Sequence, residues 1–309
     1  MMAMRCRRPS NAAGPTAWPR PDHAVAEIQP RRGRFSVGVR EDFAAWAFGG
    51  AAPSAPEPIG DLADRVLRGG FPPAVARTAP NRRRAWFDAY LATSLQRDVH
   101  DVANLTKLGD LPRLARLVAA RTARPANLAE LSRTSGIPAT TLARYLYALQ
   151  ALFLIEDVPA WSVNAGKRLA RRPKMLVSDT GLAAALLDIT HDRWANAPEA
   201  RGALVETFVG LELRKQLSWS TVPTTLHHYR EHDGVEVDWL LEAGDGRVVG
   251  IEVKAGHRVG PDAVRHLAAL RDALGDRFAR GVVLHAGPTV LPLGDRLWAL
   301  PISALWAPA

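Results

Sequence analysis

Three charged residues in the C-terminal third of the chain have the types and spacing of a hydrolytic metal site. They are Asp238, Glu252 and Lys254, in the stretch "VEVDWLLEAGDGRVVGIEVKAG". Carboxylate oxygens are the ligands that Mg²⁺ and Mn²⁺ prefer, and a bound cation can activate water and offset charge on a phosphodiester. A lysine ammonium can orient that water or stabilise the transition state. The residues therefore predict metal-dependent phosphodiester hydrolysis; the alternative is an exposed ion pair between Glu252 and Lys254.

The lysine adds weight to the hydrolytic interpretation. The chain contains 35 Arg but only five Lys, so Lys254 runs against a strong bias. Such a choice is expected where a compact ammonium is needed in place of a planar guanidinium.

The elements around these residues are predicted strands joined by the turn-forming stretches "DG" and "AGDG". Alternate residues of a strand share a face, so Glu252 and Lys254 should point the same way. Ile251 and Val253 should then point to the core. The hairpin can place Asp238 beside the charged pair.

The order of elements from residue 201 onward predicts an α/β domain around a mixed sheet. A helix, "GALVETFVGLELRKQL", precedes three strands, and "PDAVRHLAALRDALG" is a second helix before the strands "ARGVVLHAG" and "RLWALP". Glu206 on the first helix could add a third metal-binding carboxylate, and Glu212 is a weaker candidate. His227 and His228 are adjacent on a strand, so at most one of them could reach the site.

Residues 107–165 have the layout of a helix-turn-helix followed by a wing. Leu111 to Ala123 is a predicted helix, Asn127 caps a second that ends at Gly136, and Pro138 opens a third. The segment "FLIEDVPAW" then predicts a strand. This pattern favours a winged-helix domain.

In such a domain the third helix usually enters the major groove of DNA. Thr140, Thr141 and Arg144 would then lie near bases, and Arg133 could contact phosphate. The alternative is a winged helix used for protein contacts or as a spacer between domains.

The next segment is a basic connector. Its cationic residues could hold a nucleic-acid backbone, or they could form a solvated loop; they are Lys167, Arg168, Arg171, Arg172 and Lys174.

The net charge of +9 is concentrated at the start of the chain. Residues 1–40 hold eight Arg against one Asp and one Glu, and they lack hydrophobic periodicity, which predicts a disordered basic tail. One cysteine, Cys6, excludes an internal disulfide and fits a reducing compartment. Because no apolar run approaches the roughly 20 residues of a membrane helix, we expect a cytoplasmic protein with no membrane partner.

Several separated motifs resemble a known family: "LRGGFPPAV", "LQRDV", the winged-helix block, "KMLVSDTGLAAALL", "VETFVGLEL", "EVDWLLE" and "GIEVKAG". They are similar to bacterial and archaeal AAA-type ATP-binding proteins that end in the domain of unknown function 4143, over Ile59 to Trp306. The resemblance implies a C-terminal domain of the PD-(D/E)XK, or restriction-endonuclease-like, fold. It also implies that the motif carboxylates are Asp238 and Glu252, its lysine Lys254 and its helix glutamate Glu206.

The chain departs from that family at two points. Val237 stands where a proline usually precedes the aspartate. The family also carries an ATPase domain with a phosphate-binding loop, and the sequence has no G-x-x-x-x-G-K-[ST] run; Gly166-Lys167 lacks the upstream Gly and the following Ser or Thr. We therefore expect no ATP binding, and a truncated family member whose first 40 residues are foreign to the family.

Together these patterns predict an α+β multidomain protein. Its expected parts are a basic tail, a linker and helical region, a winged helix-turn-helix domain, a basic connector with a helix, and a restriction-endonuclease-like domain with a mixed central sheet, over residues 1–40, 41–106, 107–165, 166–200 and 201–309. We expect a DNA-associated protein that uses Mg²⁺ or Mn²⁺ and no nucleotide. The alternatives are a non-catalytic nucleic-acid- or protein-binding regulatory module and the remnant of a truncated ATPase family member.

Overall fold

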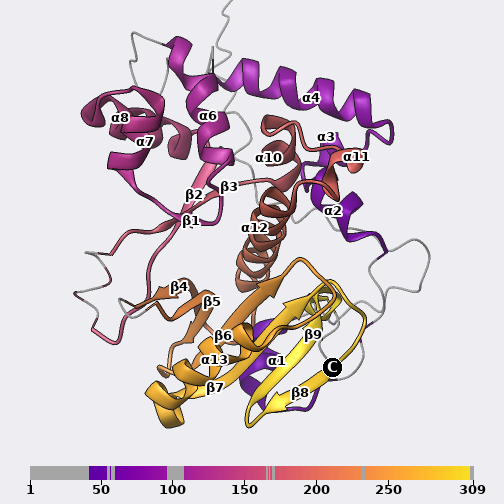
Figure 1. The fold of residues 1–309 in the computed structure, drawn as a ribbon, viewed down its shortest axis with the longest axis vertical. Coiled ribbons are helices and arrows are strands. Elements are labelled where there is room, and N and C mark those ends of the chain that lie inside the picture. Colours follow the sequence, from indigo (N-terminus) through magenta and orange to yellow (C-terminus); the bar gives the residue numbers. More distant parts are fainter. Residues whose placement is uncertain are drawn as a thin grey trace, which may run out of the picture. The chain divides into compact units, whose positions relative to one another are not determined.

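The long helix α12, Pro198–Leu217, contacts both a small upstream sheet and a larger C-terminal sheet (Figure 1). The computed structural model describes residues 42–53, 56, 60–95, 108–164, 166, 168, 171–231 and 234–306. The predicted basic tail and Lys167 lie outside these residues. All the described residues belong to one compact unit, Arg34–Ala309.

The larger sheet has six strands in the order β4-β5-β6-β7-β9-β8. The first three are antiparallel, β7 and β9 continue the sheet in parallel, and β8 is antiparallel to β9. The bounds are β4 Thr224–Arg230, β5 Glu236–Ala243, β6 Val248–Lys254, β7 Phe278–His285, β8 Leu291–Gly294 and β9 Leu297–Pro301. The mixed sheet expected from the sequence is confirmed; β8 is a strand that the sequence pattern did not indicate.

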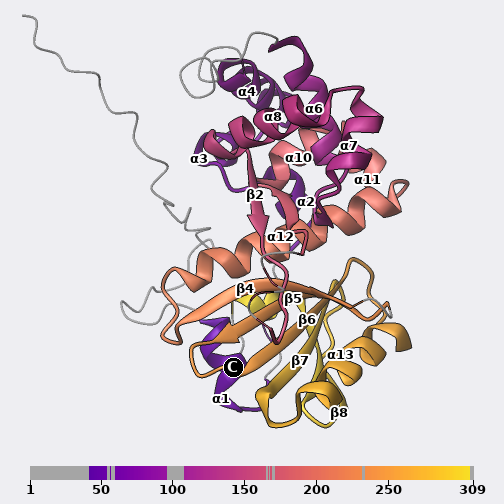
Figure 2. The same cartoon turned by 90° about the vertical axis from the view of Figure 1, so that its left-hand side faces the viewer.

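Helices cover both faces of this sheet. Trp239 and Leu241 of β5 pack in the same cluster as the apolar residues of α12, whereas Leu240 packs with Leu267 of α13, Pro261–Leu274. Figure 2 shows α13 beside β6 and β7, in agreement with its contacts. The alternation of side chains along β5 therefore assigns α12 to one face and α13 to the other.

A short helix, α1, Phe43–Gly49, also packs on α12 and β7. The Asp42 side chain caps it by accepting a hydrogen bond from the Ala45 N–H, and the Phe43 N–H donates to the Gln216 side-chain oxygen at 3.1 Å. The sequence suggested only an apolar stretch leading to a linker. Five buried apolar residues within seven instead give this segment a place in the core.

The upstream sheet is antiparallel, with the order β1-β3-β2. Along the chain, the elements are α6 Leu111–Ala119, β1 Arg124–Pro125, α7 Leu128–Ser135, α8 Ala139–Ala151, β2 Ile155–Val158 and β3 Lys174–Val177. Asn127 accepts from the Glu130 N–H at 3.3 Å, and Gly136 ends α7 with φ 73°, as the sequence indicated.

Two helix boundaries differ from expectation. The helix predicted over Leu111 to Ala123 ends at Ala119, because Ala123 has φ 62° and its N–H donates to the Met175 carbonyl at 2.8 Å, which brings the chain onto β3. The sequence also predicts an amphipathic helix with Asn81 as its N-cap. The helix at this place, α4, begins instead at Pro80, whose fixed φ suits the first helical position.

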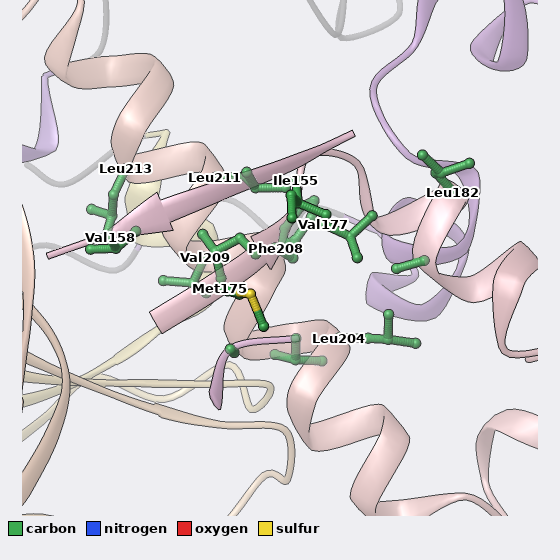
Figure 3. Packing of buried hydrophobic residues seen from close by; sticks show 14 of the residues in the cluster. Ile155, Val158, Met175, Val177, Leu182, Leu204, Phe208, Val209, Leu211 and Leu213 are labelled. Atoms are coloured by element: carbon green, nitrogen blue, oxygen red, sulfur yellow. The ribbon is translucent and has the colours of Figure 1, made fainter. Parts of the chain in front are cut away.

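The core of the upstream sheet is shared with α12 (Figure 3). Apolar residues of β2, β3 and α10, Thr180–Leu186, pack on one side of α12; they include Ile155, Val158, Met175, Val177 and Leu182. The residues of α12 in the same cluster include Leu204, Phe208 and Val209. The remaining elements are α2 Leu62–Arg68, α3 Pro72–Val75, α4 Pro80–Thr93, α11 His191–Trp194, η2 Leu108–Asp110, η3 Gly275–Arg277 and η4 Ile302–Leu305. The α+β class is confirmed; the winged-helix and restriction-endonuclease-like types stay predictions.

Among the helices of the described chain, none combines the length and the apolar character that crossing a membrane requires.

Candidate functional site

Contact between α12 and β5 positions the first carboxylate of the site. A Cβ atom at Gly210 would lie 2.6 Å from Cζ2 of Trp239, so only glycine lets the indole lie this close to the helix. The indole N–H donates to the main-chain oxygen of Glu206 at 3.2 Å. Trp239 is fully buried and thereby fixes the position of Glu206 relative to β5.

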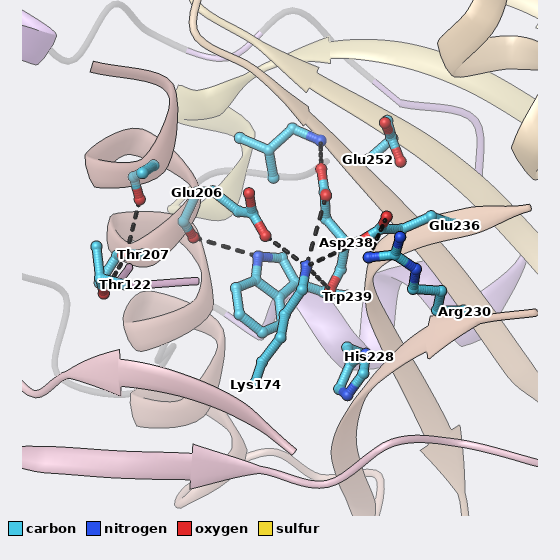
Figure 4. A network of polar contacts seen from close by, with 12 residues as sticks. Thr122, Lys174, Glu206, Thr207, His228, Arg230, Glu236, Asp238, Trp239 and Glu252 are labelled. Atoms are coloured by element: carbon cyan, nitrogen blue, oxygen red, sulfur yellow. Dashed lines mark hydrogen bonds and ion pairs between the residues drawn. The ribbon is translucent and has the colours of Figure 1, made fainter. Parts of the chain in front are cut away.

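Lys174, the first residue of β3, reaches this carboxylate from the upstream sheet (Figure 4). Its Nζ atom is 2.5 Å from Oε1 of Glu206 and 3.6 Å from Oδ1 of Asp238, and its side chain is 2% exposed. The ammonium also lies 5.0 Å from the centroid of the Trp239 ring and 4.0 Å from Oε1 of Glu236. A buried charge requires such partners, because removal from water is costly.

Asp238 lies in the middle of the site because of a bulge in β5. Two residues of β5, Asp238 and Trp239, stand opposite one residue of β4 at this point. Such a bulge re-aims a side chain. While Oδ1 faces Lys174, Oδ2 accepts a hydrogen bond from the N–H of Val253 on β6 at 2.8 Å.

Glu252 and Lys254 form the other half of the site, as the alternation of β6 predicted. Their charged atoms are 2.9 Å apart, while Ile251 and Val253 point into the core. The Glu252 side chain is 8% exposed and that of Lys254 is 36% exposed, so the ion pair joins a buried carboxylate to a partly exposed ammonium. The Oε2 atom of Glu252 is buried and has no hydrogen-bond partner among the described residues.

Glu206 and Glu252 hold protons more tightly than usual. Burial and then the charge of Asp238 raise the pKa of Glu206 to about 8, although Lys174 opposes the shift. The same two causes raise the pKa of Glu252 to about 7, against the effect of Lys254. Burial lowers the pKa of Lys174, but its carboxylate neighbours outweigh burial and the net shift is upward. Glu252 can therefore exchange a proton near neutral pH.

The side chains have the chemistry of a divalent-cation site but not its arrangement. Glu206, Asp238 and Glu252 supply hard oxygen atoms. Yet within the described part of the chain, no three His, Cys, Asp or Glu side chains surround a common point suitable for a metal ion. The ammonium of Lys174 lies between Glu206 and Asp238 instead. As arranged, these residues do not fit a divalent cation.

The other polar candidates of the C-terminal domain lie outside this cluster. Glu212 pairs with Lys215 at 2.5 Å. Nε2 of His227 lies 3.8 Å from the Glu242 carboxylate. His228 lies near Lys174 (Figure 4), and its Nε2 is 3.0 Å from the main-chain oxygen of Arg172.

The basic connector is largely engaged within the protein. Arg168 makes a bidentate ion pair with Glu242 at 2.6 and 2.9 Å, and Arg171 pairs with Glu231 at 2.9 Å. Arg172 is exposed. The side chain of Lys174 is buried, so in this position it cannot make the contact with nucleic acid that the sequence suggested.

The predicted recognition helix presents its residues to solvent. On α8, Thr140 and Arg144 are exposed and Thr141 is half-buried; Arg133, on α7, is also exposed. Tyr147, which the sequence reasoning missed, is 64% exposed and follows Thr140 and Arg144 at helical spacing on α8. A Tyr on an otherwise polar helix face is the signal that could have identified it.

Comparison with known proteins identifies the domain around this site. Residues 201–305 match DUF4143, a domain of unknown function, and residues 59–193 match DUF8612, another domain of unknown function. A DUF4143 domain is therefore present, as expected from the motifs, and it contains Glu206, Asp238, Glu252 and Lys254. Lys174 belongs to the DUF8612 match. The ATPase and PD-(D/E)XK parts of the resemblance stay predictions.

Two relatives match most of the chain. They are uncharacterized proteins of Mycobacterium tuberculosis and Mycobacterium bovis, each 33% identical over 242 residues, which is 77% of this chain and 52% of the relative. The chain thus spans about half the length of the curated relatives it matches. No solved structure matches.

Proposed function

We propose that this chain is a nucleic-acid-associated protein with a nuclease-like C-terminal domain whose reaction is phosphodiester hydrolysis dependent on Mg²⁺ or Mn²⁺. The single observation that supports the proposal is the meeting of Glu206, Asp238 and the Glu252–Lys254 pair where α12 faces β5 and β6. The order α12-β4-β5-β6-α13-β7 around them accords with the restriction-endonuclease-like fold that the motifs imply.

The residues of the site have separate roles in this proposal. Lys254 would offset negative charge that develops on the phosphate, because its ammonium is fixed beside Glu252. Glu252, with a pKa of about 7, would move a proton to or from the reacting water. Asp238, held by the Val253 N–H, would keep its orientation throughout. The reaction requires Lys174 to leave its place between Glu206 and Asp238.

The test is cleavage of labelled single- and double-stranded DNA and RNA over a range of Mg²⁺ and Mn²⁺ concentrations. We expect cleavage at millimolar metal, and loss of at least about 100-fold in rate for Lys254→Met, as found when one charge-stabilising group is removed from a catalytic site. Lys215→Met is the matched control, because Lys215 pairs with Glu212 away from the cluster. Equal rates for K254M and the wild type would overturn hydrolysis at this site.

A second candidate function is a non-catalytic binding module, in which α8 contacts nucleic acid or a protein. It is favoured by the exposed residues Thr140, Arg144 and Tyr147 and by the neutralisation of the carboxylates by two lysines. Fluorescence anisotropy with duplex DNA tests it. If α8 lies in the groove, Arg144→Ala should weaken binding by about 1–3 kcal/mol, whereas Arg265→Ala, at an exposed position on α13, should not.

A further inference from the structure

The ammonium of Lys174 lies among three oxygen atoms beside α12. Its Nζ atom faces Oε1 of Glu206 at 2.5 Å, Oδ1 of Asp238 at 3.6 Å and the main-chain oxygen of Asp238 at 3.3 Å. These oxygen atoms belong to the C-terminal domain, whereas Lys174 begins a strand of the upstream sheet. A cation from one part of the chain is therefore bound by the carboxylates of another.

A second, independent observation concerns a carboxylate oxygen of Glu252 that has no hydrogen-bond partner among the described residues. Glu252 is 6% exposed, and this oxygen is its buried Oε2 atom. Buried carboxylate oxygens nearly always have a partner. Lys254 uses only the other oxygen of this group. The Oε2 atom, beside two further carboxylates, is therefore an acceptor that a cation could use.

We propose that Lys174 is a built-in competitor of the divalent cation, so that Mg²⁺ or Mn²⁺ binds Glu206 and Asp238 only when the Lys174 side chain is displaced. The inference deepens the proposed function and rests on it for the identity of the cation. Two cations cannot share this buried position, because their repulsion is weakly screened there.

The test is equilibrium binding of Mn²⁺ to the full chain, followed by the electron paramagnetic resonance signal of free Mn²⁺. Lys174→Met removes the ammonium but keeps an apolar side chain of similar length, and it should bind Mn²⁺ at least about tenfold more tightly than the wild type, a difference of about 1.4 kcal/mol. Lys174→Arg keeps the positive charge and should behave as the wild type. Lys215→Met, in which another lysine with a carboxylate partner at 2.5 Å is replaced, should also leave the affinity unchanged.

The added Mn²⁺ affinity should depend on the carboxylates, so the double variant K174M/D238N should lose it. The proposal is overturned if K174M binds Mn²⁺ no more tightly than the wild type, or if K215M gains as much. If K174M does not fold, the wild type carries the test. Tight Mn²⁺ binding by the wild type that Asp238→Asn abolishes would show that Lys174 does not compete.

The outcome is separable from that of the proposed function. If K174M gains a Mn²⁺ site while no variant cleaves nucleic acid, the competition stands and hydrolysis does not. Cleavage by the wild type at micromolar metal, lost in K254M, would instead support hydrolysis and refute the competition.

Discussion

At the scale of single residues, His228 contributes to the stability of the fold in a way that depends on pH. Burial, followed by the positive charge of Lys174, lowers its pKa from 6.5 to about 4. The unfolded chain therefore binds a proton at this residue between about pH 6.5 and 4 while the folded chain does not, so the contribution of His228 to stability falls as the pH falls through this window. The difference corresponds to a loss on the order of 3 kcal/mol. The raised pKa values of Glu206 and Glu252 act in the opposite direction.

Replacement of the His228 side chain should remove its contribution. We expect the unfolding free energy of the wild type, relative to that of His228→Asn, to fall by about 3 kcal/mol between about pH 6.5 and 4, measured by urea denaturation of both proteins at each pH. His191→Asn is the control, because His191 is exposed. A variant H228N with the same acid sensitivity as the wild type would assign that sensitivity to other groups.

The sequence could predict only part of the site. The two-residue period of a strand correctly placed Glu252 and Lys254 on one side, because that relation is local. Lys174 is 32 residues from Glu206 and 64 from Asp238, and no local pattern encodes such a contact. The sequence pattern assigns Lys174 to a basic connector because several Arg and Lys residues precede it. The rarity of lysine, which drew attention to Lys254, was the available signal, since both Lys174 and Lys215 also pair with carboxylates.

At the scale of elements, the close packing of α12 on β5 depends on Gly210. A methyl group there would lie 2.6 Å from the Trp239 ring, which is buried and cannot move freely. We expect Gly210→Ala to lower the free energy of unfolding by about 1–3 kcal/mol, the usual cost of overpacking.

Gly202, on the same helix, provides the matched control. A Cβ atom there would meet no other atom within 4 Å. Gly202→Ala should therefore leave stability unchanged or raise it by up to about 1 kcal/mol, because alanine favours helix more than glycine does. The two variants can be compared by chemical denaturation. Similar effects at both positions would contradict the role assigned to Gly210.

Most element types were predictable, whereas some element ends were not. The caps at Asn127 and Gly136 are local signals and marked α7 correctly. The end of α6 depends on a hydrogen bond between Ala123 and Met175, which are distant in sequence. Likewise α1 forms where apolar residues find a partner in α12, and β8 where the chain returns alongside β9.

At the scale of the whole molecule, the regions that match two different domain families share one core. Thr122 is fully buried; its hydroxyl accepts from the N–H of Val177 at 3.1 Å and lies 2.9 Å from the hydroxyl of Thr207 on α12. The described residues also form one compact unit. The upstream region and the DUF4143 domain should therefore unfold together.

Calorimetry can test this expectation. Thr122→Val leaves the Val177 N–H without its acceptor and should lower stability by about 1–3 kcal/mol. We expect one thermal transition that moves as a whole to lower temperature, and no shift for Thr134→Val, which is exposed on α7. Two separate transitions, of which T122V moves only one, would show that the regions are energetically independent.

The connector between β2 and β3 also protects the edge of the large sheet. The His228 N–H donates to the Pro159 carbonyl at 3.1 Å, and the Trp161 N–H donates to the His228 carbonyl at 2.7 Å, so this segment pairs with β4. At the opposite edge, β8 is four residues long and contains Pro292, which has no N–H to offer. Exposed strand edges recruit strands from other molecules and start aggregation. The segment that leads to Lys174 thus helps to keep the chain from associating with its own copies through strand pairing.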